Sequence, residues 1–140
     1  MPKQTTQTVS VTSRSRCEII DLTGQVEQIV RQSVKSGFVI VYVPHTTAGV
    51  TINENADPDV KSDFLKKLET FVPKSEPYYE HSEGNSDSHV KTALVGNSAT
   101  ILVEDGRLLL GRWQGIYFCE FDGPRRREVY VRPVDLSAAV

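Results

Sequence analysis

The chain has 140 residues, of which 39% are apolar and 24% charged, a composition typical of one soluble globular domain over residues 1–140. Eighteen acidic against sixteen basic side chains give a formal net charge of −2, which argues against a general nucleic-acid or anionic-membrane binder. No apolar run approaches the roughly 20 residues of a membrane span, and residues 1–6 contain no apolar signal segment, so we expect a cytoplasmic protein.

The first half of the chain alternates predicted strands with predicted helices. Hydrophobic periodicity predicts strands over 6–12, 17–22, 38–43 and 49–53, and helices over 24–36 and 58–71. Gly37 is placed to end the first helix, and Asp57 followed by Pro58 is typical of the N-cap and first position of the second. The almost continuously apolar run 38–43 predicts a strand that is buried on both faces.

The second half is predicted to be mostly β. Residues 74–88 form the longest stretch without periodicity, and we predict an ordered loop over a site, because flexible linkers seldom carry two tyrosines and a histidine. A short helix, capped by Asp87 or Ser88, is expected to run through Val95 and to end at Gly96. Strands are predicted over 100–103, 108–110, 113–121 and 127–134. Helices interleaved with antiparallel hairpins indicate an α+β domain, a two-layer β-sandwich with helices on the outside.

The two cysteines lie in apolar, strand-like runs. Cys17 and Cys119 have no CxxC spacing and are too few for a disulfide scaffold. We predict two buried thiols, with a bridge between them left open.

The chain has three histidines, and all three lie in polar, non-periodic surroundings. His45 follows a strand, His81 lies in the long loop and His89 lies at a helix start. Three imidazoles around a divalent ion with an open fourth position are a familiar catalytic zinc arrangement, so we predict a shared site for zinc. Their spacings match no local zinc motif, and three unrelated histidines are the alternative.

A carboxylate and several hydroxyls accompany His45. Glu54 is a candidate general base or further metal ligand, although a surface carboxylate at a strand end is the alternative. Thr46, Thr47 and Ser88 offer hydroxyls for phosphate oxygens, while threonine in a turn and serine before a helix are also routine.

Two further segments are candidates for recognition. Residues 111–115 place Arg112 and Gln114 around Trp113 between two glycines. A tryptophan in such a run is most often a core residue, and a recognition edge formed with Arg112 and Gln114 is the alternative. Arg125, Arg126 and Arg127 are most simply a solvated run, in which strand alternation points Arg126 opposite to its neighbours.

Taken together, three blocks of sequence resemble the secondary thiamine-phosphate synthase family, with the YjbQ-like fold. The blocks are residues 45–48 with 53–58, residues 79–81 with 84 and 88–91, and residues 98–106 with 111–116. They occur in the family's order and cover nearly the whole chain. Arg112 departs from the pattern, since threonine is more usual there, and its added charge alters anion binding at that edge.

The resemblance implies a compact sandwich that assembles as a homotrimer, with the motif residues in one pocket. It implies the joining of a pyrimidine-methyl diphosphate to a thiazole phosphate, giving thiamine phosphate and pyrophosphate, as a secondary activity. His45 and Glu54 would be catalytic, and His45, His81 and His89 would hold the metal. The substrate-binding set would be Thr46, Thr47, Asn53, Asn55, Ser88, Arg112, Gln114 and Arg126.

The residues are compatible with that reaction but not diagnostic of it. Loss of diphosphate needs positive charge on the leaving oxygens, which a divalent ion, zinc or magnesium, and Arg112 or Arg126 can supply. A metal-dependent hydrolase with Glu54 as general base is one alternative. A non-catalytic trimer that binds a phosphorylated metabolite is another.

Overall fold

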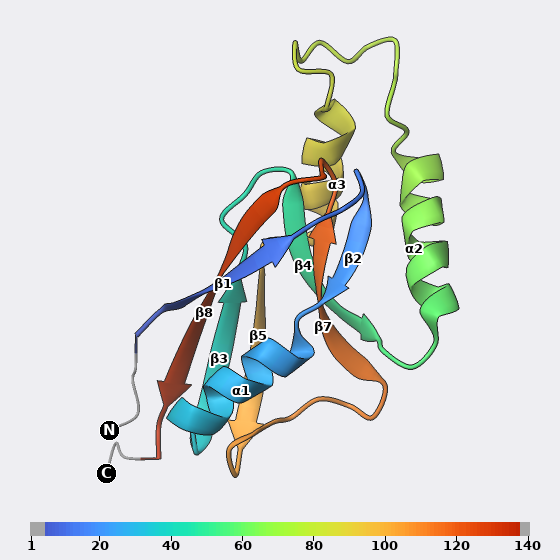
Figure 1. The fold of residues 1–140 in the computed structure, drawn as a ribbon. Coiled ribbons are helices and arrows are strands. Elements are labelled where there is room, and N and C mark those ends of the chain that lie inside the picture. The colour runs from blue at the N-terminus through green and yellow to red at the C-terminus, as the bar shows by residue number, and fades with distance from the viewer. Residues whose placement is uncertain (1–4, 138–140) are drawn as a thin grey trace.

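The computed structural model describes residues 5–137, in which eight strands form two sheets and three helices surround them (Figure 1). The strands are β1 (Gln7–Thr12), β2 (Glu18–Asp21), β3 (Ser36–Tyr42), β4 (Ala48–Glu54), β5 (Ser98–Glu104), β6 (Arg107–Leu108), β7 (Gln114–Glu120) and β8 (Arg126–Asp135). The helices are α1 (Thr23–Ser33), α2 (Pro58–Phe71) and α3 (Ser86–Val95). The predicted α+β sandwich is confirmed.

The two sheets are antiparallel throughout and pack face to face. The larger has the strand order β1-β8-β3-β5-β6, and the smaller has the order β2-β7-β4. Strands that follow one another in the chain, β1 and β2 or β3 and β4, therefore lie in different sheets and do not pair. The core between the sheets includes Val39, Val41, Val131, Val50 and Phe118.

Strand β3 is buried on one face rather than on both. Val39 and Val41 are fully buried, whereas Phe38 and Ile40 are half-buried and Tyr42 is exposed. The continuous apolar run therefore has two roles: alternate residues fill the core, and the others lie on the outer face of the five-stranded sheet.

Helix α1 closes one end of the sandwich and ends earlier than predicted. It stops at Ser33, and Val34 is already extended, although Gly37 had been expected to end the helix. Gly37 instead lies in β3, where a Cβ atom would come 2.1 Å from the carbonyl oxygen of Val134. The glycine is required by the close approach of β8, not by a helix end.

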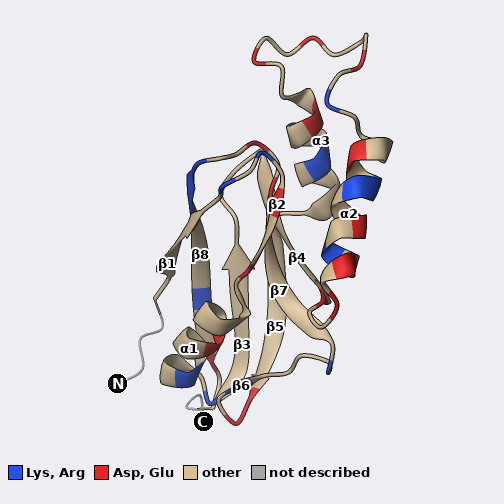
Figure 2. Cartoon of the chain, turned by 45° about the vertical axis from the view of Figure 1, so that its right-hand side comes forward, with Lys and Arg blue, Asp and Glu red and all other residues tan. Residues whose placement is uncertain are grey.

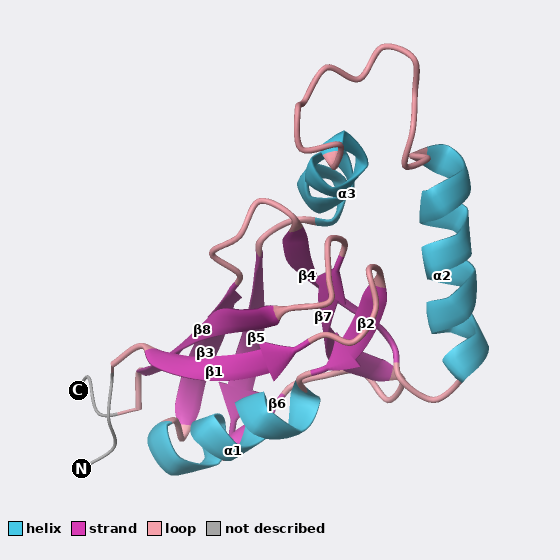
Figure 3. Cartoon of the chain, turned by 45° about the horizontal axis from the view of Figure 1, so that its top comes forward, coloured by secondary structure: helices cyan, strands magenta, loops and turns pink. Residues whose placement is uncertain are grey.

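Helix α2 stands beside the three-stranded sheet and is not packed deeply against it (Figure 3). The predicted cap is confirmed, because the Asp57 side chain accepts a hydrogen bond from the backbone of Asp59 at 2.9 Å. No residue of α2 is buried; Phe64 and Leu68 are half-buried, and Phe71 is 70% exposed.

Helix α3 packs its carboxyl end against β4. The backbone nitrogen of Val50 donates to the carbonyl oxygen of Gly96 at 3.0 Å, and a Cβ atom on Gly49 would come within 2.4 Å of that oxygen. Only glycine at position 49 permits this approach. Among residues 5–137, no helix is both long and apolar enough to cross a membrane.

Both thiols are free. Cys119 is fully buried, and burial raises its pKa to about 12; Cys17 is only half-buried.

Candidate functional site

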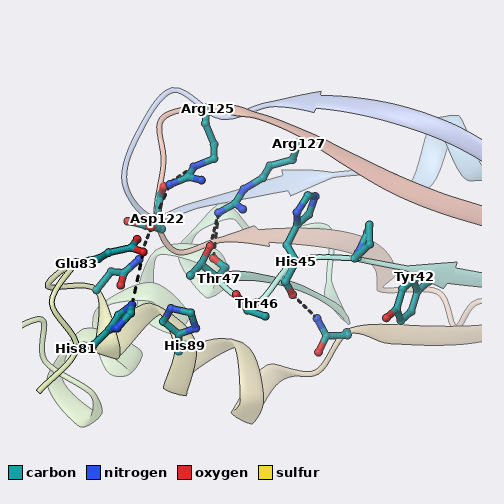
Figure 4. A pocket seen from close by; sticks show the side chains of 13 residues that line it. Tyr42, His45, Thr46, Thr47, His81, Glu83, His89, Asp122, Arg125 and Arg127 are labelled. Atoms are coloured by element: carbon teal, nitrogen blue, oxygen red, sulfur yellow. Dashed lines mark hydrogen bonds and ion pairs between the residues drawn. The ribbon is translucent and has the colours of Figure 1, made fainter. Parts of the chain in front are cut away.

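An open cavity of about 700 Å³ lies where β3 ends, beside the β7–β8 turn and the amino end of α3 (Figure 4). Its wall carries all three histidines, His45, His81 and His89, together with Arg125 and Arg127. These residues come from three distant segments of the chain, so folding alone brings them together. We call this cavity the histidine cleft.

His45 is fixed against strand β8. Its Nε2 atom lies 3.0 Å from the carbonyl oxygen of Glu128 and 3.3 Å from the backbone nitrogen of the same residue. The amide of Asn97 donates to the carbonyl oxygens of Val43 and His45, at 3.1 and 2.9 Å, and so fixes the turn. Burial lowers the pKa of His45 more than its backbone contact raises it, and the charge of Arg127 lowers it further. The ring is therefore neutral at pH 7.

His81 and His89 lie side by side on another wall of the cleft (Figure 4). Their ring centroids are 5.2 Å apart in an edge-to-face arrangement. His81 comes from the long loop and approaches Glu83, with 4.0 Å between its Nε2 atom and the carboxylate. His89 lies in the first turns of α3. The predicted loop over the site thus supplies one histidine, and the predicted helix start supplies its neighbour.

The three histidines line one cleft but do not converge on one point. Within the described part of the chain, no three His, Cys, Asp or Glu side chains are grouped closely enough to hold a metal ion. His45 is turned toward Glu128, whereas His81 and His89 adjoin each other. His81 and His89 are therefore neighbours, and His45 lies apart from them.

Arg127 forms a buried ion pair next to the cleft. Its Nη2 atom lies 2.5 Å from a carboxylate oxygen of Glu120, and both side chains are almost completely buried. The same nitrogen donates to the Thr47 hydroxyl at 2.8 Å. Glu120 also accepts from the Ser13 hydroxyl and the backbone of Asp122. Burial raises the pKa of Glu120, but these hydrogen bonds and the Arg127 charge outweigh it, so the pKa is lowered.

Arg125 is the more available of the two arginines. It is half-exposed and pairs with Asp122 at 3.1 Å, an arrangement that contributes little to stability. Asp122 also accepts from the side-chain amide nitrogen of Asn85 at 2.8 Å. The buried Oδ1 atom of Asn85 has no hydrogen-bond partner among the described residues. This edge of the cleft can exchange one exposed ion pair for a ligand anion.

A chain of buried charges holds α3 in place. Asp87 is fully buried between Arg16, at 2.8 Å, and Lys91, at 2.9 Å. Lys91 is also buried and lies 2.7 Å from Glu69 of α2. Figure 2 shows α2 and α3 as neighbours, each with positively and negatively charged positions. The network joins the β1–β2 turn to both helices and so fixes the helix that carries His89.

Ser88 and Arg126 lie outside the cleft. The Ser88 hydroxyl is buried and donates to the carbonyl oxygen of Phe121 at 2.6 Å. Arg126 points away from Arg127, as strand alternation predicts, and donates to the Ser10 hydroxyl at 2.8 Å. Of the predicted hydroxyls, Thr46 and Thr47 do line the cleft.

The remaining predicted site residues lie at the other end of β4. Glu54 ends the strand and pairs with Gln114 on β7, whereas His45 precedes its first residue by three positions. Ala48 and Glu54 are six residue steps apart along the strand, about 20 Å. Glu54 lines a small hollow under α2, so the structure does not place it beside the histidines.

Four polar side chains of this second group, those of Asn53, Asn55, Arg112 and Gln114, have local partners. Asn53 accepts from the backbone of Glu54 at 2.7 Å, and Gln114 from that of Gly111 at 2.7 Å. Asn55 accepts from the Tyr117 hydroxyl. Arg112 lies 4.8 Å from the centroid of the Trp113 ring. The polar residues predicted as one site therefore form two separate groups in a single copy of the chain.

Sequence reasoning missed several residues of the cleft wall. Arg125 and Arg127 were treated as a solvated run, although alternation alone put them on the face opposite to Arg126. Tyr42 was treated as part of a buried strand, and nothing in the sequence marks Asn97 as the residue that fixes the turn.

Known proteins are similar to this chain over most of its length. A family model described as UPF0047 protein YjbQ-like matches residues 7–135. UPF0047 protein YugU of Bacillus subtilis is 49% identical over 127 residues, covering 90% of this chain and 96% of the relative. UPF0047 protein MJ1081 of Methanocaldococcus jannaschii is 53% identical over 123 residues, covering 87% and 88%.

Solved structures share the fold. A protein of the YjbQ/UPF0047 family from Clostridium acetobutylicum superposes with a TM-score of 0.89 at 49% identity, covering 91% of this chain and 99% of that one. A YbjQ-like protein of unknown function from Sulfolobus solfataricus superposes with a TM-score of 0.86 at 32% identity, covering 91% and 94%.

Proposed function

The chain belongs to the UPF0047 YjbQ-like family, and from this premise we propose that the histidine cleft is the site of a metal-assisted enzyme that acts on phosphorylated heterocycles. The observation that supports the proposal is the meeting of three histidines, two arginines and the hydroxyls of Thr46 and Thr47 in one cavity. Imidazoles bind divalent ions, and guanidinium groups bind phosphate oxygens.

The proposed reaction resembles thiamine-phosphate synthesis. The lone pair of a thiazole nitrogen forms a bond to the pyrimidine-methyl carbon, the carbon–oxygen bond breaks, and diphosphate leaves with its electron pair. The protein then needs no nucleophile, only positive charge near the leaving oxygens. Arg125 can turn from Asp122 toward this anion, while Arg127 stays fixed by Glu120.

We propose His81 and His89 as the residues that hold the cation, with zinc or magnesium as the candidates. When bound there, the ion adds positive charge for the diphosphate oxygens. His45, committed to the Glu128 backbone, orients the substrate from the opposite wall. Glu54, which lines a different hollow of the same copy, has no role in this scheme, and the alternative hydrolase would need a general base other than Glu54 of that copy.

A turnover assay tests the proposal. The purified protein is supplied with the pyrimidine-methyl diphosphate, the thiazole phosphate and magnesium or zinc, and thiamine phosphate and pyrophosphate are both measured. We expect equal amounts of the two products, with little formation by His89→Ala and unchanged formation by Glu54→Gln. Binding of both compounds without any product would favour the non-catalytic binding protein instead.

We also propose that the chain acts as a homotrimer. Helices α2 and α3 carry exposed apolar side chains, Phe71, Val90 and Leu94, which offer a surface for self-association away from the histidine cleft's Tyr42. Light scattering at micromolar concentration tests this, and a monomer would contradict it.

A further inference from the structure

Tyr42 forms one end of the histidine cleft. It is the last residue of β3, it is 45% exposed, and its side chain lies on the outer face of the five-stranded sheet. Tyr42 also lines the cavity that contains the three histidines (Figure 4). An exposed aromatic ring at the edge of a polar cavity can stack on a planar group of a ligand without any rearrangement of the core.

The ring of Tyr42 is supported on one side only. On the β8 side its cross-strand partner is Tyr130, and the two rings are stacked with centroids 6.5 Å apart and planes inclined by 23°. On the β5 side its partner is Ser98, whose side chain is small. The stacking with Tyr130 restrains the orientation of Tyr42, while the short, exposed side chain of Ser98 can cover little of the Tyr42 ring.

Strand β8 sets the distance between this ring and the polar part of the cleft. Glu128, whose backbone contacts His45, lies two residues before Tyr130, so both residues share one face of the strand. Arg125 lies at the beginning of the same segment. The cleft thus has an aromatic surface toward one end and cationic and imidazole groups toward the other, which fits an elongated ligand with a ring at one end and a phosphate at the other.

We infer that Tyr42, backed by Tyr130, is the stacking surface for the aromatic ring of the ligand and selects aromatic over aliphatic phosphates. This inference rests on the function proposed above and adds to it the residue that recognises the ring. Tyr42 is a specificity residue: it does not contact the phosphate and takes no part in bond breaking.

The test compares two ligands that share a charged group and differ in the ring. Phenylphosphonate and cyclohexylphosphonate are titrated into the full-length protein by calorimetry, with inorganic phosphate as a third probe. We expect the wild-type protein to bind phenylphosphonate on the order of tenfold more tightly than cyclohexylphosphonate. Tyr42→Leu should remove this preference and leave the affinity for inorganic phosphate unchanged, while Tyr42→Phe should keep the preference.

Two further variants control for folding and for general hydrophobicity. Tyr130→Leu should reduce the preference only partly, because it removes the support and not the stacking surface. Leu102→Ala alters another exposed apolar residue of the same sheet face and should leave the preference unchanged. Thermal melts of all variants identify any that fail to fold.

The possible failures are distinguishable. Equal binding of the two phosphonates by the wild-type protein, or a preference that survives in folded Tyr42→Leu, would overturn the assignment of Tyr42 while leaving the phosphate site in place. Absence of binding for all three probes would overturn the proposed function and this inference with it.

Discussion

The Nε2 atom of His45 lies 3.0 Å from the backbone oxygen of Glu128, which turns this ring away from the neighbouring pair His81 and His89. One of its two nitrogens is therefore already engaged, and the three histidines of the cleft are not equivalent. We therefore expect His45 to contribute less to metal binding than His81 and His89.

We predict that His81→Ala and His89→Ala each abolish tight zinc binding, whereas His45→Ala weakens it only modestly. The reason is that the first two rings adjoin each other, with centroids 5.2 Å apart, and the third is bonded elsewhere. Equilibrium dialysis followed by elemental analysis measures the zinc per chain. Glu54→Gln, at the far end of β4, is the matched control and should bind like the wild-type protein; complete loss in His45→Ala would instead support a three-histidine site.

We predict that Arg127→Met lowers the free energy of unfolding by about 3–5 kcal/mol, because it leaves the buried Glu120 carboxylate without its partner. The double variant Glu120→Gln/Arg127→Met should recover much of this loss, since no uncompensated charge remains. Urea unfolding measures both. A single variant as stable as the wild-type protein would show that the pair does not matter for folding.

We predict that stability decreases in acid partly through Glu120. Its pKa is lowered in the folded protein from an ordinary value of 4.5, so the folded state binds the proton less tightly than the unfolded state. The stabilisation is therefore fully present above about pH 4.5 and is lost as the pH falls through the lowered pKa. Urea unfolding between pH 7 and pH 3 measures this, and Glu120→Gln should show a shallower decline over that interval.

We predict that Lys91→Met destabilises the protein by about 3 kcal/mol, because it leaves buried Asp87 with Arg16 as its single cationic partner. Glu69→Gln tests the outer half of the same network. Glu69 is half-exposed, so this change should cost less than about 1 kcal/mol. Equal losses in the free energy of unfolding for Lys91→Met and Glu69→Gln would contradict this difference between the buried and the exposed ion pair.

We predict that Arg112→Thr leaves zinc and phosphate binding unchanged. Arg112 is exposed, lies over the Trp113 ring and does not line the histidine cleft. Its effect on the free energy of unfolding should stay within about 0.5 kcal/mol. A marked loss of phosphate affinity would mean that this end of the molecule takes part in the site, as it would if another copy of the chain carried it there.

Local signals in the sequence predicted the elements well but not their partners. The Asp57 cap, the extent of α2 and the strand alternation that separates Arg126 from Arg127 depend on neighbouring residues, and the structure confirms them. The pairing of β1 with β8 joins residues more than 100 positions apart, and no local pattern encodes it.

The sequence predicted some residues of the candidate site but not others. His45, His81 and His89 were grouped by the chemistry of their side chains, and they do share a cleft. Glu54 was grouped with them because it is near His45 in the sequence, but an extended strand carries neighbours apart, and α2 covers the end at which it lies. The role of Tyr42 depends on which face of β3 is covered, and that is decided by the second sheet.

The close approach of Gly49 to Gly96 fixes where the carboxyl end of α3 meets the sheet, although neither glycine lines the cleft. Because the helix that carries His89 meets the sheet at this glycine, the spacing between His89 and the opposite wall is set from outside the cavity. A methyl group at position 49 would push the helix end outward and alter the width of the cleft without changing any residue that lines it. The size of ligand that the cleft admits therefore depends on position 49, which does not line the cavity.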